Sequence, residues 1–347
     1  MQNLQIGIAG YGIVGKRRHK SLSKIKNIKV VAICDKKIKN EGINRSGIKL
    51  LKNYNKLLLE GIDAIIICMT NDIAPLVTLE AIKKNIHVFC EKPPGRNMED
   101  IIKVIRAYKK NPHLKVMYGF NHRYHYSIDY AKNIIDKKKY GKIISLRGVY
   151  GKSKMITFNQ NDWRTKRKIA GGGVLLDQGI HLIDLMRYFV GDFNEVKSFV
   201  SNDYWKFDVE DNVYAIMKTS NNIFASMQSS ATQWKHVFNL EINFEKALLI
   251  LSGLKTSSKS YGNETLKIIK KNMIGYKNNE ITKKFNIDKS MDIEINNFIH
   301  SIIKNKKIVS GSCIDAYKTM KIVFDIYYQD KLWRNKFNIK KPYNLNV

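Results

Sequence analysis

The first 120 residues alternate short apolar runs with segments in which apolar residues recur at helical spacing. The apolar runs lie at residues 4–9, 28–34, 64–69, 87–90 and 114–118. The segments of helical period lie between them, at residues 14–26, 74–84 and 98–109. Strands that alternate with helices in this way form a parallel sheet covered by helices. The pattern therefore predicts an α/β domain at the start of the chain.

The pattern changes after residue 120, where strands begin to follow one another directly. A helix is expected at residues 127–138, a strand at 143–150, and a helix that opens on a glycine run at 171–189. Five further strands are expected at residues 193–201, 212–219, 223–230, 238–244 and 247–252. Such strands form an antiparallel meander, and two helices, at 292–304 and 314–328, close the chain. We therefore expect two domains, residues 1–121 and residues 122–347.

Composition changes this picture little. The chain has 347 residues, of which 44% are hydrophobic, enough for two domains with buried cores. Its formal charge of +31, from 61 Lys and Arg against 30 Asp and Glu, raises the question of a nucleic-acid partner. Nucleic-acid binders concentrate their charge on one face, whereas the lysines here are scattered along the chain. We therefore expect no nucleic-acid partner.

The sequence carries no signal for a membrane or for secretion. No apolar run approaches the roughly 20 residues that a membrane-spanning helix needs, and no basic segment precedes the interrupted apolar stretch at residues 6–14. The four cysteines, Cys34, Cys68, Cys90 and Cys313, form no Cys-x-x-Cys pair and are interpreted as reduced thiols. We therefore expect a cytoplasmic protein without a membrane partner.

A glycine-rich turn follows the first predicted strand and opens a predicted helix. It consists of Gly10, Tyr11, Gly12, Ile13, Val14 and Gly15. In this context Gly-x-Gly-x-x-Gly indicates dinucleotide binding, because its glycines permit a tight turn and close approach of the backbone to a pyrophosphate. Asp35 ends the second strand, where a carboxylate can bind ribose hydroxyls, which favours NAD; Lys36 and Lys37 keep NADP open. Met69 and Asn71, after the third strand, are further candidates for cofactor contacts.

A second signal follows the fourth predicted strand. Glu91 and Lys92 stand at its carboxyl end, before Pro93 and Pro94, which restrict the backbone. Ligands of parallel α/β sheets bind at the carboxyl ends of the strands. We therefore expect Glu91 at the cofactor site and Lys92 beside the nicotinamide.

The most informative segment is the glycine run at residues 171–173, which opens a predicted helix. Asp177 and His181 are four residues apart and so share one face of that helix. Imidazole, with an ordinary pKa of about 6.5, suits the removal of a hydroxyl proton. Asp184 is further along the same face, and we expect it to pair with a basic neighbour. The segment indicates a site that handles protons.

Basic and aromatic residues outside these motifs are candidates for substrate binding. Arg123 can bind hydroxyls or an anionic group through its guanidinium. Trp163 can cover the face of a sugar ring, with packing as the alternative role, and Arg164 follows it on the loop before the glycine run. His122 and His125 have a His-x-x-His spacing, but no carboxylate or cysteine cluster accompanies them. We therefore expect no metal site.

Together these motifs resemble those of the glucose-fructose oxidoreductase and inositol dehydrogenase family (Gfo/Idh/MocA). The motifs that carry the resemblance are residues 10–15, residues 91–93, and the glycine run with Asp177, Gly179, His181 and Asp184. The resemblance covers nearly the whole chain. It implies an N-terminal Rossmann domain and a C-terminal α/β domain with a large, mostly antiparallel sheet.

The resemblance also implies roles for single residues. Lys92, Asp177 and His181 take the family's catalytic positions, and Asn121 and Arg123 lie in a segment similar to the one that lines its substrate cleft. In the family the open face of the large sheet often forms a dimer or tetramer interface. We therefore expect a homodimer or a homotetramer.

These residues predict hydride chemistry on a hydroxyl group. His181 would take the hydroxyl proton, Lys92 would stabilise the developing alkoxide, and Asp177 would orient the substrate or the imidazole. We expect an oxidoreductase that uses NAD, or NADP, on a ring hydroxyl or keto group of a sugar, a cyclitol or a nucleotide-linked sugar. Basic residues, among them Arg164 and Lys166, favour an anionic substrate.

Two alternatives stay open. The first is an NAD-dependent glycosidase or lyase that oxidises its substrate only transiently. The second is a non-catalytic protein that binds and senses nicotinamide cofactors.

Overall fold

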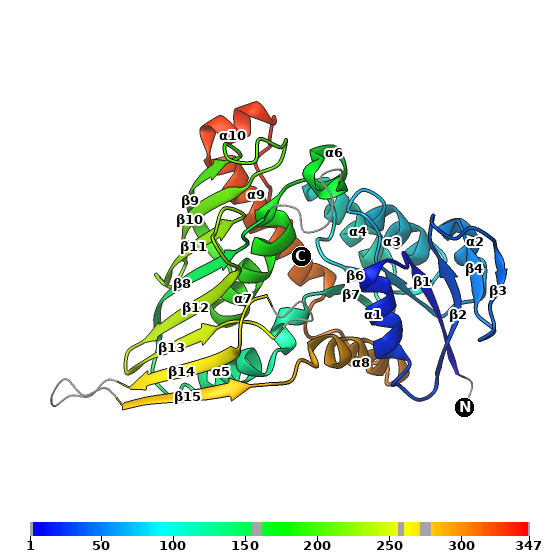
Figure 1. Ribbon diagram of the computed structural model, residues 1–347, viewed down its shortest axis with the longest axis horizontal. Coiled ribbons are helices and arrows are strands. Elements are labelled where there is room, and N and C mark those ends of the chain that lie inside the picture. Colours follow the sequence, from blue (N-terminus) through cyan, green and yellow to red (C-terminus); the bar gives the residue numbers. More distant parts are fainter. Residues whose placement is uncertain (1–2, 155–161, 256–259, 271–278, 346–347) are drawn as a thin grey trace. The chain divides into compact units, whose positions relative to one another are not determined.

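The computed structural model describes residues 3–154, 162–255, 260–270 and 279–345, which form two compact units (Figure 1). Unit 1 contains the residues up to Phe120 together with Met291–Tyr317. Unit 2 contains Asn121–Ser290 and the residues from Lys318 onward. The predicted ranges, 1–121 and 122–347, differ from these units because they assign the segment Met291–Tyr317 to the second domain.

Unit 1 is built on a seven-stranded sheet in the order β3-β4-β2-β1-β5-β6-β7. Its strands are β1 (Leu4–Ala9), β2 (Ile28–Cys34), β3 (Gly42–Ile43), β4 (Lys49–Leu51), β5 (Ala64–Ile67), β6 (His87–Glu91) and β7 (Val116–Gly119). All neighbours pair in parallel except β3 and β4. Strands β5 and β7 are buried at every position, as expected where helices cover both faces. The predicted parallel α/β domain is confirmed, although the short β3 and β4 were not predicted.

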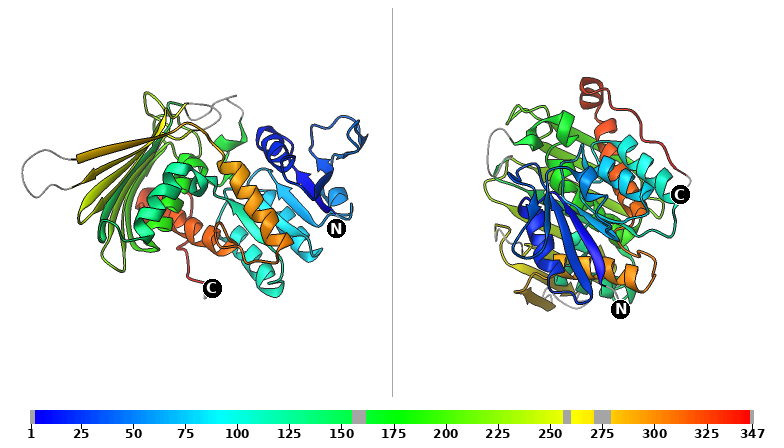
Figure 2. Two further views of the ribbon diagram at one scale, coloured as in Figure 1. Left: turned by 90° about the horizontal axis from the view of Figure 1, so that it is seen from below. Right: turned by 90° about the vertical axis from the view of Figure 1, so that its right-hand side faces the viewer.

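Helices cover both faces of this sheet. They are α1 (Ile13–Leu22), α2 (Tyr54–Leu57), α3 (Ala74–Lys83), α4 (Met98–Lys110) and α8 (Ser290–Ile303). Figure 2 shows α1 and α8 on one face and α4 on the other. The Phe298 ring of α8 meets the Phe89 ring of β6 at 5.6 Å, centroid to centroid. This contact fastens α8 to unit 1 although it is far from β6 in the sequence.

Unit 2 is built on an eight-stranded sheet in the order β15-β14-β13-β12-β8-β11-β10-β9. Its strands are β8 (Ile143–Gly151), β9 (Phe193–Ser201), β10 (Asn212–Thr219), β11 (Phe224–Ser230), β12 (Val237–Phe244), β13 (Ala247–Ser252), β14 (Glu264–Lys270) and β15 (Asn279–Phe285). Every pair is antiparallel except β8 with β11. The predicted mostly antiparallel sheet is confirmed. Strands β14 and β15 extend it beyond the strands that the sequence predicts.

The helices on one face of this sheet include α5 (Tyr126–Asp136), α7 (Ile180–Val190) and α9 (Cys313–Gln329), which belongs to unit 2 from Lys318 onward (Figure 2). Helix α7 approaches β8 closely, because a Cβ on Gly148 would stand 2.8 Å from the side chains of Leu182 and Met186. Shorter helical segments are η1 (Asn121–Tyr124), η2 (Trp163–Thr165), α6 (Arg167–Ala170), η3 (Leu175–Gly179) and α10 (Lys331–Lys336).

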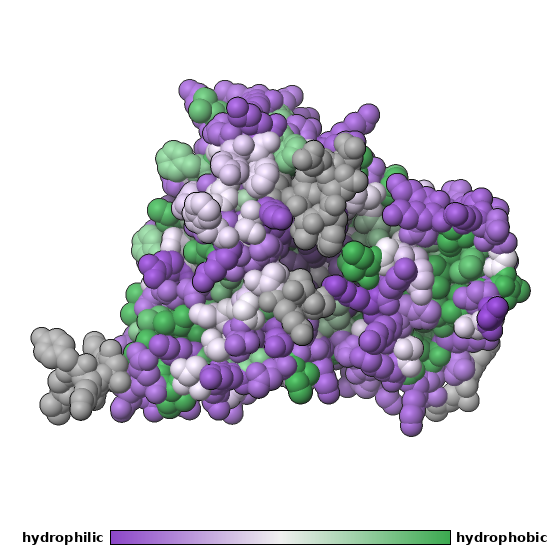
Figure 3. Space-filling model, in the orientation of Figure 1, coloured by the Kyte–Doolittle hydropathy of each residue, from purple (hydrophilic) through white to green (hydrophobic). Residues whose placement is uncertain are grey.

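The other face of the large sheet carries exposed apolar side chains. In β10, Val213 and Ala215 are buried, whereas Tyr214 and Ile216 between and after them are 51% and 60% exposed. On the neighbouring β9, Phe199 is 80% exposed. Elsewhere, on the side drawn in Figure 3, hydrophilic residues are spread over the surface with hydrophobic ones among them. Within the described ranges no helix combines the length and apolar character that a membrane crossing requires.

Candidate active site

The turn between β1 and α1 is shaped by its glycines. Gly10 has φ of +90°, and a Cβ there would lie 2.4 Å from the Cys68 carbonyl oxygen. A Cβ on Gly15 would lie 2.0 Å from the Gly10 carbonyl oxygen, so helix and turn meet without room for a side chain. Gly12, in contrast, faces open space among the described residues and is the N-cap of α1. The first-turn amides of Ile13 and Val14 are therefore placed at the positive end of the helix dipole, as a bound phosphate requires.

Asp35 lies directly after β2, beside this turn. Its carboxylate accepts hydrogen bonds from the backbone amides of Tyr11 at 2.7 Å and Lys37 at 2.8 Å. The Tyr11 hydroxyl in turn lies 2.7 Å from Nδ1 of His19 on α1. These bonds hold the carboxylate at the carboxyl end of β2, where the ribose of a dinucleotide would be bound.

Arg18 of α1 is a buried anchor that the sequence did not reveal. Its Nε donates to Glu91 at 2.7 Å and its Nη2 to Glu294 of α8 at 2.6 Å. The guanidinium also lies over the Phe89 ring, 4.5 Å from its centroid. Glu91, expected at the cofactor site, gives its carboxylate to Arg18. Glu91 directly precedes Lys92, so this ion pair holds the end of β6 from which Lys92 follows. A contact of Glu91 with the cofactor stays a prediction.

Lys92 is partly exposed at the end of β6, and its bond to Pro93 is cis. Met69 and Asn71 follow β5, which lies between β1 and β6 in the sheet. Because the strands are parallel, the glycine turn, these two residues and Lys92 share one edge of the sheet. Unit 1 thus gathers the cofactor candidates at the edge where dinucleotides bind in such folds.

In unit 2 the glycine run is held by Glu210, a second residue that sequence reasoning missed. The buried Glu210 carboxylate accepts hydrogen bonds from the amides of Gly173 at 2.7 Å and Leu175 at 3.0 Å, and from the Tyr327 hydroxyl at 2.5 Å. A Cβ on Gly172 would stand 2.3 Å from that hydroxyl. Glu210 satisfies amides at the start of the helix and so fixes where the following residues point. Its own burial raises the pKa of Glu210, although these hydrogen bonds oppose the shift.

Asp177 and His181 follow this anchor but lie in different surroundings. Asp177 belongs to the π-helical turn η3, and its side chain is 28% exposed. Nζ of Lys152, the residue after β8, lies 3.1 Å from its Oδ2. His181, in α7, is only 4% exposed. The pair therefore offers a partly solvated carboxylate next to a buried imidazole.

His181 is stacked on a second imidazole. The rings of His181 and His122 lie 3.8 Å apart and 11° from parallel. Nε2 of His122 is 3.0 Å from the Tyr150 hydroxyl of β8, and burial raises the pKa of Tyr150 well above its usual value. A phenol that stays protonated can hold His122 in place. The sequence placed His122 in a His-x-x-His spacing, within the segment that resembles the family's substrate-cleft segment, and gave no sign of this stack.

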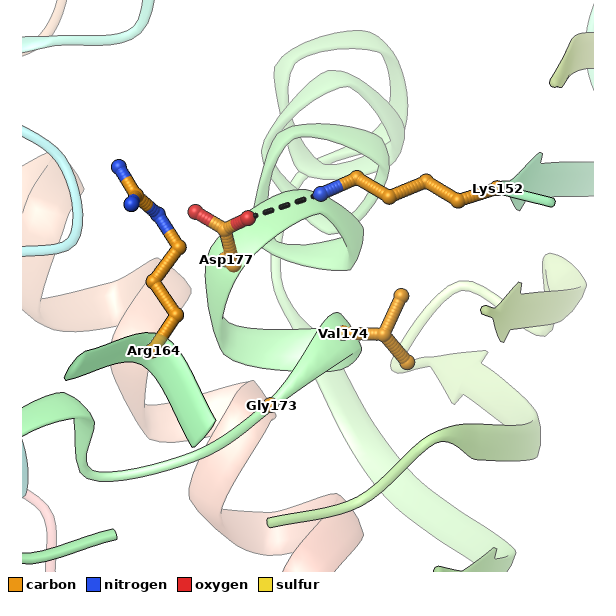
Figure 4. Close-up of a pocket in the computed structure, with 5 residues that line it drawn as sticks. All are labelled: Lys152, Arg164, Gly173, Val174 and Asp177. Carbon is orange, nitrogen blue, oxygen red and sulfur yellow. Dashed lines mark hydrogen bonds and ion pairs between the residues drawn. The ribbon is translucent and has the colours of Figure 1, made fainter. Parts of the chain in front are cut away.

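A small pocket lies beside Asp177 (Figure 4). Lys152, Arg164, Gly173, Val174 and Asp177 line it. Figure 4 shows Lys152 and Arg164 on opposite sides of the Asp177 carboxylate. Lys152, like Glu210, is not marked by any motif, because it follows β8 and reaches Asp177 of η3 only in the folded chain.

Trp163 and Arg164 both come from η2, before the glycine run. The Arg164 guanidinium lies 4.6 Å from the Trp163 ring centroid, and its Nη1 donates to both Asp162 oxygens at 3.0 and 3.1 Å. One face of the Trp163 ring therefore supports Arg164. That Trp163 also covers a sugar ring stays a prediction.

Arg123, predicted to bind substrate, forms a buried ion pair; its contact with substrate stays a prediction. Its Nε and Nη2 donate to the two oxygens of Asp184, each at 2.7 Å, and both side chains are buried. Asp184 thus pairs with a basic neighbour, as predicted, whereas the guanidinium of Arg123 is committed to a structural ion pair. Asn121 donates to the Ser290 hydroxyl at 3.1 Å.

The two histidines of the His-x-x-His pair also have protein partners. Nδ1 of His125 lies 2.8 Å from the Glu264 carboxylate, and both side chains are buried. Across the part of the chain that the structure describes, no three His, Cys, Asp or Glu side chains gather as metal ligands.

Two sequence models of one family match the chain. One, described as an oxidoreductase family with an NAD-binding Rossmann fold, matches residues 4–120. The other, the GFO/IDH/MocA C-terminal domain, matches residues 128–250. The chain belongs to the Gfo/Idh/MocA oxidoreductase family. Unit 1 is accordingly its NAD-binding Rossmann domain, and the open, amide-lined turn at Gly12 fits the pyrophosphate of that cofactor.

Individual members of the Gfo/Idh/MocA family are similar over much of the chain. Levoglucosan dehydrogenase of Pseudarthrobacter phenanthrenivorans is 26% identical over 283 residues, 71% of each chain. Glucose-6-phosphate 3-dehydrogenase of Bacillus subtilis is 29% identical over 195 residues, 54% of this chain and 55% of that protein. The solved structure of levoglucosan dehydrogenase in complex with NADH has a TM-score of 0.85 at 21% identity, covering 96% of this chain and 98% of that chain. This likeness confirms the fold, and the family makes the chain an NAD-dependent oxidoreductase.

Proposed function

We propose that the protein transfers a hydride between NAD and a ring carbon of a sugar, a cyclitol or a nucleotide-linked sugar, at a hydroxyl or keto group. The observation that carries the proposal is the buried His181 imidazole, stacked on His122 and one helical turn from Asp177, in a chain whose other unit is an NAD-binding domain. The names of three relatives support the substrate class: levoglucosan, glucose-6-phosphate and inositol dehydrogenases.

Oxidation of a secondary alcohol removes a proton from oxygen and a hydride from carbon. NAD, when bound, supplies the acceptor for the hydride. The His181 imidazole takes the hydroxyl proton, which leaves the oxygen's electron pair to form the carbonyl bond. Lys92 Nζ donates a hydrogen bond to that oxygen and stabilises its negative charge. Asp177 accepts a hydrogen bond from the substrate and orients the ring.

The proposal assigns Lys92 and His181 to the same reacting hydroxyl group. The test is NADH absorbance with a panel of sugars, cyclitols and sugar nucleotides. We expect Lys92→Ala and His181→Ala to lower kcat by about 10²–10⁴-fold, as is typical when an acid-base group is removed. Arg147→Ala, which breaks an exposed ion pair with Glu241, is the matched control. Full turnover in both variants would refute the assigned roles.

The same assay separates the alternatives. A glycosidase or lyase that oxidises transiently would consume substrate without net formation of NADH. A cofactor-sensing protein would bind NADH without turning over any member of the panel.

We further propose that copies of the chain associate through the open face of the large sheet. Phe199, Tyr214 and Ile216 make this face apolar, and surfaces of this kind mark protein interfaces.

The cysteines within the described residues are free thiols, which supports a reducing compartment such as the cytoplasm.

A further inference from the structure

We propose that the pocket beside Asp177 binds an uncharged pair of neighbouring ring hydroxyls, so that the substrate carries no carboxylate or phosphate at this position. The inference rests on the proposed function and names the part of the substrate that this pocket recognises. It departs from the sequence, in which scattered basic residues favour an anionic ligand.

The two cations of the pocket are already neutralised. Lys152 pairs with Asp177 at 3.1 Å, and Arg164 pairs with Asp162 at 3.0 Å. The two positive and two negative charges cancel. A third basic candidate, Arg123, pairs with Asp184. An anion at this pocket would meet the Asp177 carboxylate between Lys152 and Arg164, and like charges in a partly buried site repel strongly (Figure 4).

The same groups suit a hydroxyl well, because a hydroxyl both donates and accepts. An ammonium group has three N–H bonds, and Lys152 uses one of them on Asp177. A guanidinium has five N–H bonds. Arg164 donates to Asp162 through Nη1, and these two hydrogen bonds do not involve its Nε and Nη2. A carboxylate offers about four acceptor sites, so Asp177 can accept from a hydroxyl as well as from Lys152.

The order of the side chains fits two hydroxyls. With Lys152 and Arg164 on either side of Asp177, one hydroxyl can donate to Asp177 and accept from Lys152, and its neighbour can donate to Asp177 and accept from Arg164 (Figure 4). Both cations are held in advance: Lys152 by its ion pair, and Arg164 by Asp162 and the Trp163 ring. Little side-chain freedom is then lost on binding.

Two neighbouring polar side chains, those of His236 and Ser153, add no net charge to the pocket. Burial, with the nearby ammonium groups of Lys152 and Lys154, lowers the pKa of His236, which favours the neutral imidazole. Its Nδ1 lies 3.3 Å from the Ser153 hydroxyl. Lys154 is exposed, where water and salt screen its charge.

Calorimetric titration of the wild-type protein, saturated with NADH, tests the charge preference without turnover. The ligands are glucose, glucuronate, glucose-6-phosphate and the singly deoxygenated glucoses. We expect glucose to bind at least about tenfold more tightly than either anion. The desolvation of an unpaired charge is more unfavourable than a neutral hydrogen bond is favourable. Loss of one of two adjacent hydroxyls should weaken binding by about 10–100-fold, the value of hydrogen bonds to charged groups.

Variants assign the effect to the pocket. Lys152→Met and Arg164→Met should each weaken glucose binding by about tenfold or more, whereas Arg147→Met, which removes an exposed arginine with a similar ion pair, should leave it unchanged. Asp177→Asn removes the negative charge, so the preference for glucose over glucuronate should shrink or reverse. Thermal denaturation shows whether each variant is folded.

Tighter binding of glucuronate or glucose-6-phosphate than of glucose would overturn the inference. Equal losses of glucose affinity in Lys152→Met, Arg164→Met and Arg147→Met would also overturn it. Turnover of the anionic sugars with NADH formation would still be consistent with the proposed oxidoreductase function. If the protein neither bound nor turned over any sugar, the inference and the proposed function would both be refuted.

Discussion

At the scale of single residues, the stack of His122 on His181 is the feature that most directly governs the proposed base. Two parallel rings 3.8 Å apart fix the plane of His181, and the Tyr150 hydroxyl holds the second ring from its edge. A base must keep its orientation toward the proton that it removes. We therefore propose that His122 positions the His181 ring.

Substitution of His122 tests this role. His122→Ala removes the stack and should lower kcat by about 10–100-fold, because small misplacements of a catalytic group are costly. His122→Phe keeps a flat ring and should restore most of kcat. Steady-state kinetics with NADH detection measures kcat, and the Kd of NADH measures cofactor binding. Together they show whether a loss of activity arises in the reaction step or in cofactor binding. Equal kcat in the Ala and Phe variants would show that the ring is not needed.

At the scale of elements, Glu264 anchors the start of α5. Its carboxylate accepts from Nδ1 of His125 at 2.8 Å and from the Ser127 amide at 3.0 Å. Burial opposes ionisation of this group, but these hydrogen bonds outweigh it and lower its pKa below the usual 4.5. A carboxyl with a depressed pKa adds stability above its unfolded-state pKa and loses it as the pH falls through the folded value.

Glu264→Gln should therefore reduce the free energy of unfolding at pH 7 by about 1–3 kcal/mol, the cost of a buried hydrogen-bonding group that loses its proper partner. The difference in the free energy of unfolding between this variant and the wild type should become smaller as the pH falls below 4.5. Urea denaturation of the two proteins at a series of pH values measures this difference. A difference that is constant down to acidic pH would show that ionised Glu264 is not the source.

The sequence predicts the elements of unit 1 well because buried parallel strands are continuous apolar runs, such as β5 and β7. It does not predict β15, whose residues Asn279–Phe285 are mostly polar and exposed at the sheet edge. Nor does it assign α8 to unit 1, because the contacts of Glu294 and Phe298 with Arg18 and Phe89 span about 200 residues or more. Such pairings leave no local signal.

The candidate site also contains some residues that the sequence predicts and others that it does not. Motifs reveal Gly10, Lys92, Asp177 and His181 because turn geometry and helical spacing are local. Sequence motifs do not indicate Lys152 and Glu210, because each contacts a partner that is distant in the sequence and belongs to another element. One sequence also does not show that the guanidinium of Arg123 pairs with Asp184, 61 residues later.

At the scale of the whole molecule, the open sheet face predicts self-association. Ile216→Asp places a charge among exposed apolar side chains of β9 and β10, where burial of an unpaired carboxylate is strongly unfavourable. We expect the variant to sediment as a monomer while the wild type sediments as a dimer or tetramer. Leu332→Asp, at an 83% exposed position on α10, is the matched control. Identical sedimentation of the wild type and Ile216→Asp would exclude this face as the interface.

The central claim is that a hydride leaves a ring carbon of a polyol as His181 takes the hydroxyl proton. Mass spectrometry of the cofactor after reaction with a carbon-deuterated ring polyol that the wild type oxidises tests it most directly. We expect one deuterium in the NADH formed by the wild type, and almost no NADH from His181→Ala. NADH that carries no deuterium, or undiminished labelling in His181→Ala, would contradict the account.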